Sequence, residues 1–262
     1  MHAVSNFKPD SRFVSHVVPS PNRNERIDVA APDILLLHYT GMPSMETALE
    51  RLLSRESRVS CHYFICEDGA VLQLVAEADR AWHAGASFWE RGNDLNSRSI
   101  GIEIVNPGHE FGYRDFPEAQ IAALIALAQD IGVRRAIRPD HVLAHSDVAP
   151  SRKDDPGERF PWRRLAEAGI GLWVPPAPIV PGPAFGPGDV GEVTAFQQAL
   201  AAYGYGIAPS GVYDVATAQG VIAFQRHFRT ERVDGRADPS TLRTLNALIA
   251  ARAALLDRAA PV

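Results

Sequence analysis

Short apolar runs alternate with longer amphipathic segments along the first two thirds of the chain, a pattern that predicts strands interleaved with helices. The run ILLLHYT at 34–40 is continuously apolar until it reaches a histidine, which is typical of a strand buried on both faces. METALERLLS at 45–54 carries apolar residues at helical spacing, and Ser44 is suited to cap its N-terminus. We therefore expect a strand followed by a helix.

The same alternation continues to the middle of the chain. Three further apolar segments predict strands: VSCHYFIC (59–66), SIGIEIVN (99–106) and HVLAH (141–145). Asp68 and Gly69 form a strong hairpin signal after the first of them. PEAQIAALIALAQDIG at 117–132 predicts an amphipathic helix with Pro at its start and Gly near its end. The expected fold is α/β, with a central mixed β-sheet flanked by helices.

A proline-rich segment separates this domain from a smaller C-terminal part. VPPAPIVPGPAFGPGD at 174–189 has six Pro and three Gly in sixteen residues, so it predicts an extended, semi-rigid linker. The expected organisation is an N-terminal extension at 1–28, the α/β domain at 29–173, the linker, and a small domain at 190–262 that is able to fold alone.

The C-terminal part contains an internal repeat. VTAFQQAL at 193–200 and VIAFQRHF at 221–228 match after a shift of 28 residues, and both have apolar residues at helical spacing. Turn-forming residues fill the segment between them. Two related helical halves predict a small all-α domain.

Composition and charge narrow the range of partners. The net charge is −5 and the isoelectric point is near 6.0, so no nucleic acid partner is expected.

The chain has no run of about 18 apolar residues and no signal-peptide core, so we expect no transmembrane segment. The predicted location is cytoplasmic, with the periplasm or cell envelope as the alternative if the sequence is trimmed. Cys61 and Cys66 are expected to be buried apolar residues.

Two histidines each close a predicted strand. His38 follows four aliphatic residues, and His145 follows Val-Leu-Ala. If the two strands are neighbours, both imidazoles point into one cleft, which suits a catalytic zinc site with three protein ligands and an open fourth position. Asp147, Asp154 and Asp155 are the candidates for the third ligand, and spacing alone does not choose among them.

Glu103 interrupts the aliphatic pattern of its strand. A carboxylate in that position is costly unless it is paired or used. If it faces the cleft, it can orient the attacking water and take its proton; the alternative is a salt-bridged glutamate on an exposed face.

Cys61 and His62 suggest a cysteine hydrolase, but neighbours on a strand point to opposite faces and cannot form a dyad with each other.

Several of these segments together resemble a known enzyme family. The motifs are ILLLHYT, VSCHYFICEDGAVLQLV, RAWHAG, SIGIEIVN and HSDVAPSRKDDPGERFPW. In this order they resemble the zinc-dependent N-acetylmuramoyl-L-alanine amidases of the amidase-2 type, most closely the AmiD branch, which are related to peptidoglycan recognition proteins. The C-terminal motifs AFQ, GVYDVAT and VDGRADPSTL are similar to the peptidoglycan-binding domain type 1, although Gly220 replaces a better helix former there, at about 1 kcal/mol.

The resemblance implies a ligand set and a reaction. It places His38, His145 and Asp155 on the zinc positions, and Glu103 and Lys153 on the catalytic ones. The implied reaction is hydrolysis of the amide between N-acetylmuramic acid, or its anhydro form, and L-Ala in peptidoglycan or muropeptides. Glu103 is expected to move the proton, and Lys153 to stabilise the oxyanion.

The resemblance also implies roles around the site. Four further residues are expected to bind substrate: His62, Trp82, His83 and Asn106. Asp147 becomes a structural loop residue and Asp154 an outward-facing one. Two rival functions stay open, namely a non-catalytic muropeptide-binding protein on the same fold and a cysteine peptidase that uses Cys61.

Overall fold

The computed structural model describes residues 7–90 and 92–259, so residues 1–6 of the predicted N-terminal extension lie outside the described part of the chain. The strands are β1 (His16–Val17), β2 (Arg23–Glu25), β3 (Ile34–Tyr39), β4 (Tyr63–Ile65), β5 (Val71–Gln73), β6 (Asp79–Ala81), β7 (Ser99–Ile104) and β8 (Val142–Ala144). The helices are α1 (Met45–Leu53), α2 (Leu95–Arg98), α3 (Gly108–Phe111), α4 (Glu118–Arg135), α5 (His145–Val148), α6 (Trp162–Glu167), α7 (Val193–Tyr203), α8 (Val215–Phe228) and α9 (Pro239–Ala259).

Six strands form the central sheet, in the order β1-β5-β4-β7-β3-β8. All neighbouring pairs are parallel except β4 and β5, which form the hairpin expected at Asp68-Gly69. Gly69 adopts a φ of 88° in that turn, a conformation that costs glycine little. The mixed sheet predicted from the sequence is confirmed, and β2 and β6 add a separate two-stranded sheet.

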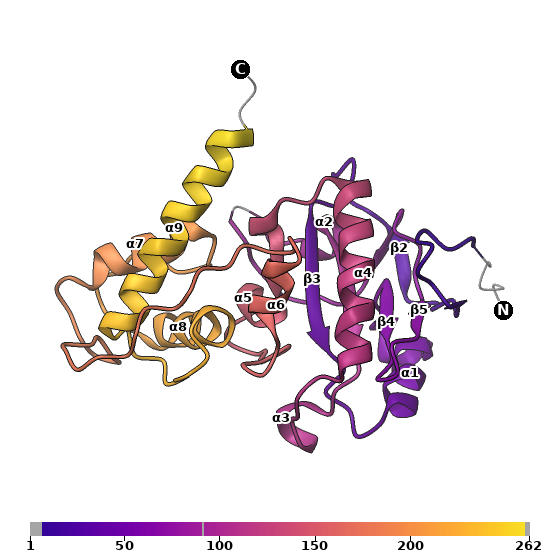
Figure 1. The fold of residues 1–262 in the computed structure, drawn as a ribbon, viewed down its shortest axis with the longest axis horizontal. Helices are drawn as coiled ribbons and strands as arrows, with labels where there is room; N and C mark the ends of the chain where they lie inside the picture. The colour runs from indigo at the N-terminus through magenta and orange to yellow at the C-terminus, as the bar shows by residue number, and fades with distance from the viewer. Residues whose placement is uncertain (1–6, 91, 260–262) are drawn as a thin grey trace.

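The register of β3, β7 and β8 sorts their side chains onto two faces. Leu35 and Leu37 lie beside Ile100 and Ile102, and this face packs under α4 and α6 (Figure 1). On the opposite face Leu36 pairs with Gly101 in β7 and with Leu143 in β8. Since side chains alternate along a strand, His38 continues this second face beyond Leu36.

Helix ends differ in detail from the sequence pattern. α1 begins after Ser44, whose side chain accepts a hydrogen bond from the Thr47 amide as expected of an N-cap. α4 continues three residues past Gly132 and ends where Ala136 takes a left-handed conformation, so that glycine does not stop the helix. Arg134 and Arg135 of this last turn pair with the buried Glu77, a tertiary contact beyond the local signal.

The two helical halves of the C-terminal domain are equivalent in their hydrogen bonds. Gln197 of α7 accepts from the Gly211 amide and donates to Thr217. Gln225 of α8 likewise accepts from the Gly235 amide and donates to a threonine, Thr241. The repeat is therefore structural, although α8 begins at Val215, six residues before the repeated segment.

Gly220 has a packing reason to be glycine. A β-carbon there would lie 2.8 Å from Cδ1 of Ile207, on the segment that connects α7 and α8. The residue therefore allows close packing within the C-terminal domain, which offsets its poor helix propensity.

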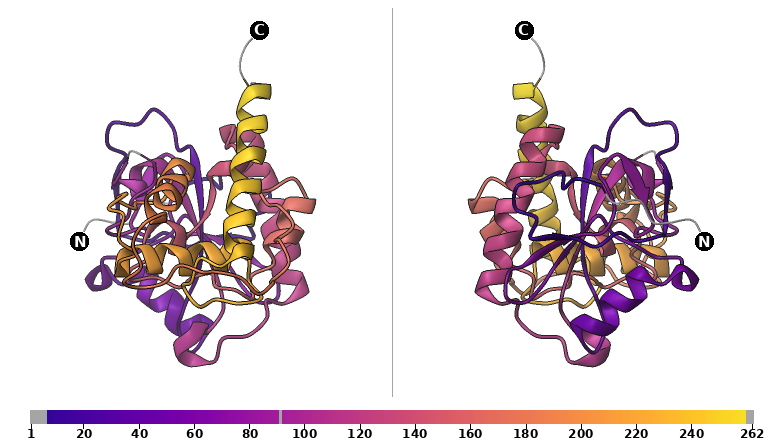
Figure 2. Two further views of the ribbon diagram at one scale, coloured as in Figure 1. Left: turned by 90° about the vertical axis from the view of Figure 1, so that its left-hand side faces the viewer. Right: turned by 90° about the vertical axis from the view of Figure 1, so that its right-hand side faces the viewer.

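The C-terminal domain shares a hydrophobic core with the sheet. Ile34, Leu36 and Leu143 of the sheet belong to one cluster with Phe224 and Leu245 of the C-terminal helices. Figure 1 shows this domain against α5 and α6, and Figure 2 shows the end of α9 projecting beyond the rest of the chain. None of the described helices is both long enough and apolar enough to cross a bilayer.

The proline-rich linker lies against the domain that it precedes. The amide of Ala177 donates to Thr244 of α9 at 3.0 Å, and its carbonyl accepts from Ser240 at 2.6 Å. Phe185 forms a backbone bridge with Ala237. No helix or long strand occurs in this segment, in keeping with an extended chain, and the domain boundaries drawn from the sequence stay predictions.

Candidate metal centre and active site

Three predicted metal ligands meet at one point. Nδ1 of His38 lies 2.9 Å from Nδ1 of His145, and both atoms lie 3.0 Å from Oδ2 of Asp155. All three side chains are buried, and their facing atoms come from residues up to 117 positions apart. Two imidazole nitrogens and a carboxylate oxygen that converge in this way could hold a metal ion, and they match the donor types that zinc takes in proteins.

The electrostatics favour the ionisation states that bind metal. Burial, helped by the neighbouring His145, lowers the pKa of His38 to about 4, which keeps this imidazole neutral at pH 7. Burial alone would raise the pKa of Asp155, but the contacts with His145 and His38 outweigh it and hold that pKa well below its usual range. Neutral imidazole and ionised carboxylate are the forms that coordinate a cation.

The far nitrogens of both imidazoles have fixed partners. Nε2 of His145 lies 3.1 Å from the carbonyl of Ala84, and Nε2 of His38 lies 3.0 Å from Nδ1 of His83. His83 in turn contacts the Ser99 hydroxyl through Nε2, at 3.3 Å. A proton on each of these Nε2 atoms leaves both Nδ1 atoms free to bind a metal, as partners behind metal-ligating histidines usually ensure.

A glycine in the middle of β7 makes room for this support. A β-carbon on Gly101 would lie 2.5 Å from Cγ of His83, so only glycine lets that ring come this close to the strand. The supporting role of His83 adds to its predicted contact with substrate.

An irregular arm, residues 145–158, carries Asp155 to the two histidines. The Ser146 amide donates to the carbonyl of Asp155 at 3.0 Å and ties the arm back to its own beginning. The Tyr113 hydroxyl donates to the carbonyl of Pro156 at 2.7 Å, and its ring packs where Gly157 has no side chain. Apart from the short helix α5 at its start, the arm has no regular secondary structure, and these hydrogen bonds to its backbone hold it in place.

Glu103 lies on the same face of the sheet as the metal ligands. It pairs in register with His38 across β7 and β3, and its buried Oε2 atom has no hydrogen-bond partner among the residues that the structure describes. Burial, with Asp155 nearby, raises the pKa of Glu103 well above 4.5, and Lys153 opposes the shift. A desolvated carboxyl beside a candidate metal centre is suited to take up and release a proton.

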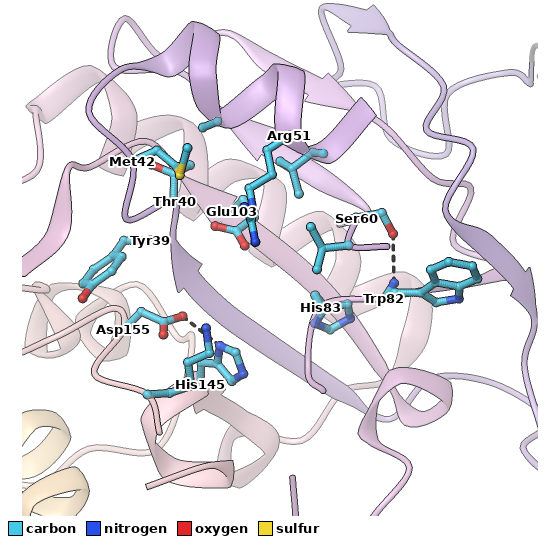
Figure 3. Close-up of a pocket in the computed structure, with 14 residues that line it drawn as sticks. Tyr39, Thr40, Met42, Arg51, Ser60, Trp82, His83, Glu103, His145 and Asp155 are labelled. Atoms are coloured by element: carbon cyan, nitrogen blue, oxygen red, sulfur yellow. Dashed lines mark hydrogen bonds and ion pairs between the residues drawn. The ribbon is translucent and has the colours of Figure 1, made fainter. Parts of the chain in front are cut away.

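A pocket of about 150 Å³ opens beside the three ligands (Figure 3). In Figure 3, His145 and Asp155 lie together on one side of it, and His83 with Trp82 on another. Its lining residues are Tyr39, Thr40, Met42, Ala48, Arg51, Leu52, Val59, Ser60, Trp82, His83, Glu103, His145, Lys153 and Asp155. The candidate catalytic residues therefore share one cavity with the candidate metal centre.

His62 and Asn106, also predicted to bind substrate, do not line this pocket. His62 is fully buried and accepts from the Gly101 amide at 3.0 Å, and burial, with the positive charge of Arg26, lowers its pKa to about 3. Asn106 donates to the carbonyl of Arg114 at 2.8 Å. Their contact with substrate stays a prediction. In the structure, both side chains make hydrogen bonds to backbone atoms.

Arg51 and Tyr39 are among the pocket residues that the sequence analysis did not single out. Arg51 lies on α1 and reaches the pocket beside Glu103, and Tyr39 follows His38 at the end of β3 (Figure 3). Tyr39 also contacts Nδ1 of His109 through its hydroxyl at 2.9 Å. In the sequence, an arginine on an amphipathic helix cannot be told from an ordinary solvent-exposed charge. For Tyr39, its position next to the candidate ligand His38 was a signal that could have predicted its place in the pocket.

The remaining chemically reactive candidates lie elsewhere. Cys61 and Cys66 are free and buried, and burial raises the pKa of the Cys61 thiol, which makes it a poor nucleophile. Cys61 packs with α1 and is absent from the pocket wall, so the cysteine peptidase hypothesis is wrong on geometry. Asp154 is half exposed, and Asp147 is buried away from the three ligands.

A second cluster of potential ligands is neutralised by arginines. Glu90, Asp140 and His141 lie close enough together to hold an ion. Arg252, however, pairs with both acids, and Arg138 pairs with Asp140 at 2.9 Å. Guanidinium groups already supply the positive charge there. Within the described residues, the better candidate for binding a metal is therefore the group of His38, His145 and Asp155.

Comparison with known proteins agrees with this geometry. The N-acetylmuramoyl-L-alanine amidase family model matches residues 28–158, and a model described as a peptidoglycan binding domain matches residues 189–245. The N-acetylmuramoyl-L-alanine amidase AmiD of Escherichia coli (strain K12) is 38% identical over 82% of this chain and 82% of its own length. The 1,6-anhydro-N-acetylmuramyl-L-alanine amidase AmpD of Enterobacter cloacae is 32% identical over 56% of this chain and 86% of its own length.

Solved structures extend the similarity to three dimensions. E. coli AmiD in complex with anhydro-N-acetylmuramic acid-L-Ala-D-gamma-Glu-L-Lys superposes with a TM-score of 0.71 at 37% identity, covering 86% of this chain and 92% of that one. AmpDh3 from Pseudomonas aeruginosa, in complex with anhydromuramic pentapeptide, gives 0.70 at 34% identity, covering 82% and 90%. With its family match, its relatives and its His-His-Asp pocket, the chain belongs to the N-acetylmuramoyl-L-alanine amidase family.

Proposed function

We propose that this amidase is a zinc hydrolase in which His38, His145 and Asp155 hold the metal and Glu103 and Lys153 act on the substrate. The observation that carries the proposal is the convergence of three ligand atoms within about 3 Å of one another beside an accessible pocket. The complete ligand set argues against the rival function of a non-catalytic muropeptide-binding protein.

The reaction is hydrolysis of the amide bond between N-acetylmuramic acid and L-Ala. Bound zinc supplies a Lewis acid that makes water more acidic and polarises the scissile carbonyl. Glu103 takes the proton of the attacking water on its unpartnered Oε2 and passes it to the departing amine. Its raised pKa suits both steps, because the group must accept a proton and then release it.

Lys153 lines the pocket on the arm, two residues before Asp155. We expect its ammonium to stabilise the negative charge that develops on the carbonyl oxygen as water adds. A fixed charge in a largely desolvated site needs no reorganisation during the step, and removal of one such stabilising group typically costs about 10²–10³ in kcat.

The substrate proposed is a muropeptide with anhydro-N-acetylmuramic acid. Support comes from relatives of similar fold, since E. coli AmiD and P. aeruginosa AmpDh3 were solved with anhydromuramyl peptides. The match of residues 189–245 to a peptidoglycan binding domain supports contact with intact wall as well. Mass spectrometry of products from defined anhydro and reducing muropeptides distinguishes the two preferences.

Location bears on the choice of substrate. A cytoplasmic enzyme meets released muropeptides, whereas a periplasmic one meets intact peptidoglycan. The cytoplasmic location stays a prediction, and fractionation of cells followed by immunodetection of the chain distinguishes it from the periplasmic alternative.

Paired substitutions test the division of roles. Asp155→Ala removes a ligand, so both zinc content and turnover should be lost. Glu103→Ala leaves the ligands intact, so zinc should stay near one equivalent while turnover falls by about 10²–10⁴. Zinc content is measured by atomic absorption and turnover by release of the peptide. Equal zinc loss in the two variants contradicts the assignment.

A further inference from the structure

A buried carboxylate that the proposed mechanism does not use connects the two domains. Asp147, two residues after His145, is 1% exposed. Its Oδ2 accepts from the Ala144 amide at 2.8 Å and contacts Nδ1 of His227 at 2.7 Å, and its Oδ1 accepts from the Tyr205 hydroxyl at 2.6 Å. Two of these three partners belong to the C-terminal domain.

Asp147 fixes the point where the chain leaves the sheet. Ala144 ends β8, and His145 begins α5, so the bond from Asp147 to the Ala144 amide stabilises the turn that aims the His145 imidazole. A carboxylate this deeply buried is costly unless its oxygens are hydrogen-bonded. Tyr205 and His227 provide those bonds.

The His227 ring is itself held in place. It stacks between Trp162 of α6, at 3.6 Å between ring centroids, and Phe228, at 3.8 Å. The ring therefore presents Nδ1 to Asp147 with little freedom to rotate.

The neighbouring residue on α8 holds the other end of the arm. Arg226 donates to Asp154 at 2.6 Å and lies 3.5 Å from Glu158. Asp154 sits between Lys153 and Asp155. The ion pair with Arg226 therefore attaches the arm to α8 next to the candidate oxyanion-stabilising lysine and the candidate metal ligand Asp155. The arginine side chain is 16% exposed, although its partner Asp154 is half exposed.

We infer that the C-terminal domain is a positioning element of the active site. Tyr205 and His227 hold Asp147, Arg226 holds Asp154, and the arm thereby presents His145, Lys153 and Asp155 together. The inference rests on the proposed zinc site, and it gives the domain a role in catalysis that is separate from any binding of cell wall.

The test compares two tyrosines in the full-length chain. Tyr205 and Tyr213 are both buried in the C-terminal domain, and each donates one hydrogen bond, Tyr205 to Asp147 and Tyr213 to the carbonyl of Gly235 at 2.8 Å. Tyr205→Phe should weaken zinc binding about tenfold and lower kcat, with KM nearly unchanged. Tyr213→Phe should lower the Tm comparably but leave zinc affinity and kcat as in the wild type.

Two further variants keep the test decisive. His227→Phe retains the stacking on Trp162 and loses the bond to Asp147, so it should change zinc affinity in the same direction as Tyr205→Phe. If either buried variant does not fold, Arg226→Gln at the domain boundary should give a smaller loss of zinc affinity.

The outcomes separate the inference from the function on which it rests. Zinc affinity comes from competition with a chromophoric chelator, well below the Tm, and kcat and KM from a defined muropeptide. Wild-type values in the folded Tyr205→Phe, His227→Phe and Arg226→Gln variants would overturn the inference alone. A wild-type chain that takes up no zinc would overturn the proposed function.

Discussion

The two faces of the central sheet are built from the same strands, but one is apolar and the other carries the candidate active-site residues. On one face Leu35, Leu37 and Ile102 pack under α4 and α6. On the other, the apolar residue Leu36 gives way to the polar residues His38 and Glu103 within two positions. The comparison shows that alternation along a strand can supply a stable core and a reactive site from one short segment.

The reactive face is divided along the strands. Its apolar end, around Ile34 and Leu36, is covered by the C-terminal domain, whereas the carboxyl ends of β3 and β8 carry His38 and lead into His145. Ligand sites form at the carboxyl ends of parallel strands because loops diverge there and leave a cleft. One end of this face therefore belongs to the hydrophobic core, and the opposite end carries the candidate active site.

The largest expected effect tests the apolar face. Ile102→Ala deletes a fully buried side chain from the face under α4, so the free energy of unfolding should fall by about 2–5 kcal/mol. The folded fraction should still bind one zinc, since no ligand is touched. Denaturant titration and zinc content check both statements, with Ile102→Val, expected to cost about 0.5–1.5 kcal/mol, as the control. Selective zinc loss in stably folded Ile102→Ala would break the separation of the faces.

A smaller effect is expected on the reactive face. Gly101→Ala places a methyl group against His83, which must move and weaken its contact with His38. We expect a loss of about 1–3 kcal/mol in stability and weaker zinc binding. Gly132→Ala in α4 is the matched control, because nothing lies within 4 Å of its added methyl group and helix propensity should stabilise it. Similar results by thermal melting and zinc competition in the two variants would count against the support of His38 by His83.

The smallest expected effect has a sign that depends on pH. Because the pKa of Glu103 is raised by burial, the metal-free fold holds this proton more tightly than the unfolded chain, and the stability that the proton gives is lost as pH rises above 4.5 toward the folded pKa. Glu103→Gln cannot ionise. Its Tm relative to the wild type should therefore rise between pH 4 and pH 7 in the presence of chelator. A difference that stays constant with pH would show that the carboxyl is not desolvated.

The candidate site illustrates which signals are local. His38, His145 and Glu103 each break an apolar run, so the sequence marks them as residues that must be used or paired. Asp155 lies among several acids in an irregular segment, and spacing left three candidates. The resemblance to the amidases chose Asp155, and the structure brings that residue to His38 across 117 positions. Arg51 had no local signal because its role depends on where α1 packs.

The sequence by itself determined β3, β4, β7 and β8, the hairpin, the helical repeat and the positions where polar groups interrupt the sheet, because hydrophobic periodicity and turn residues act over a few positions. It did not indicate the short strands β1, β2 and β6. Only the tertiary structure decided how the arm, α8 and the sheet meet: that His83 supports His38 over Gly101, and that Tyr205 and His227 hold Asp147. Those contacts depend on strand register and domain packing. Both are set by long-range burial that no local pattern encodes.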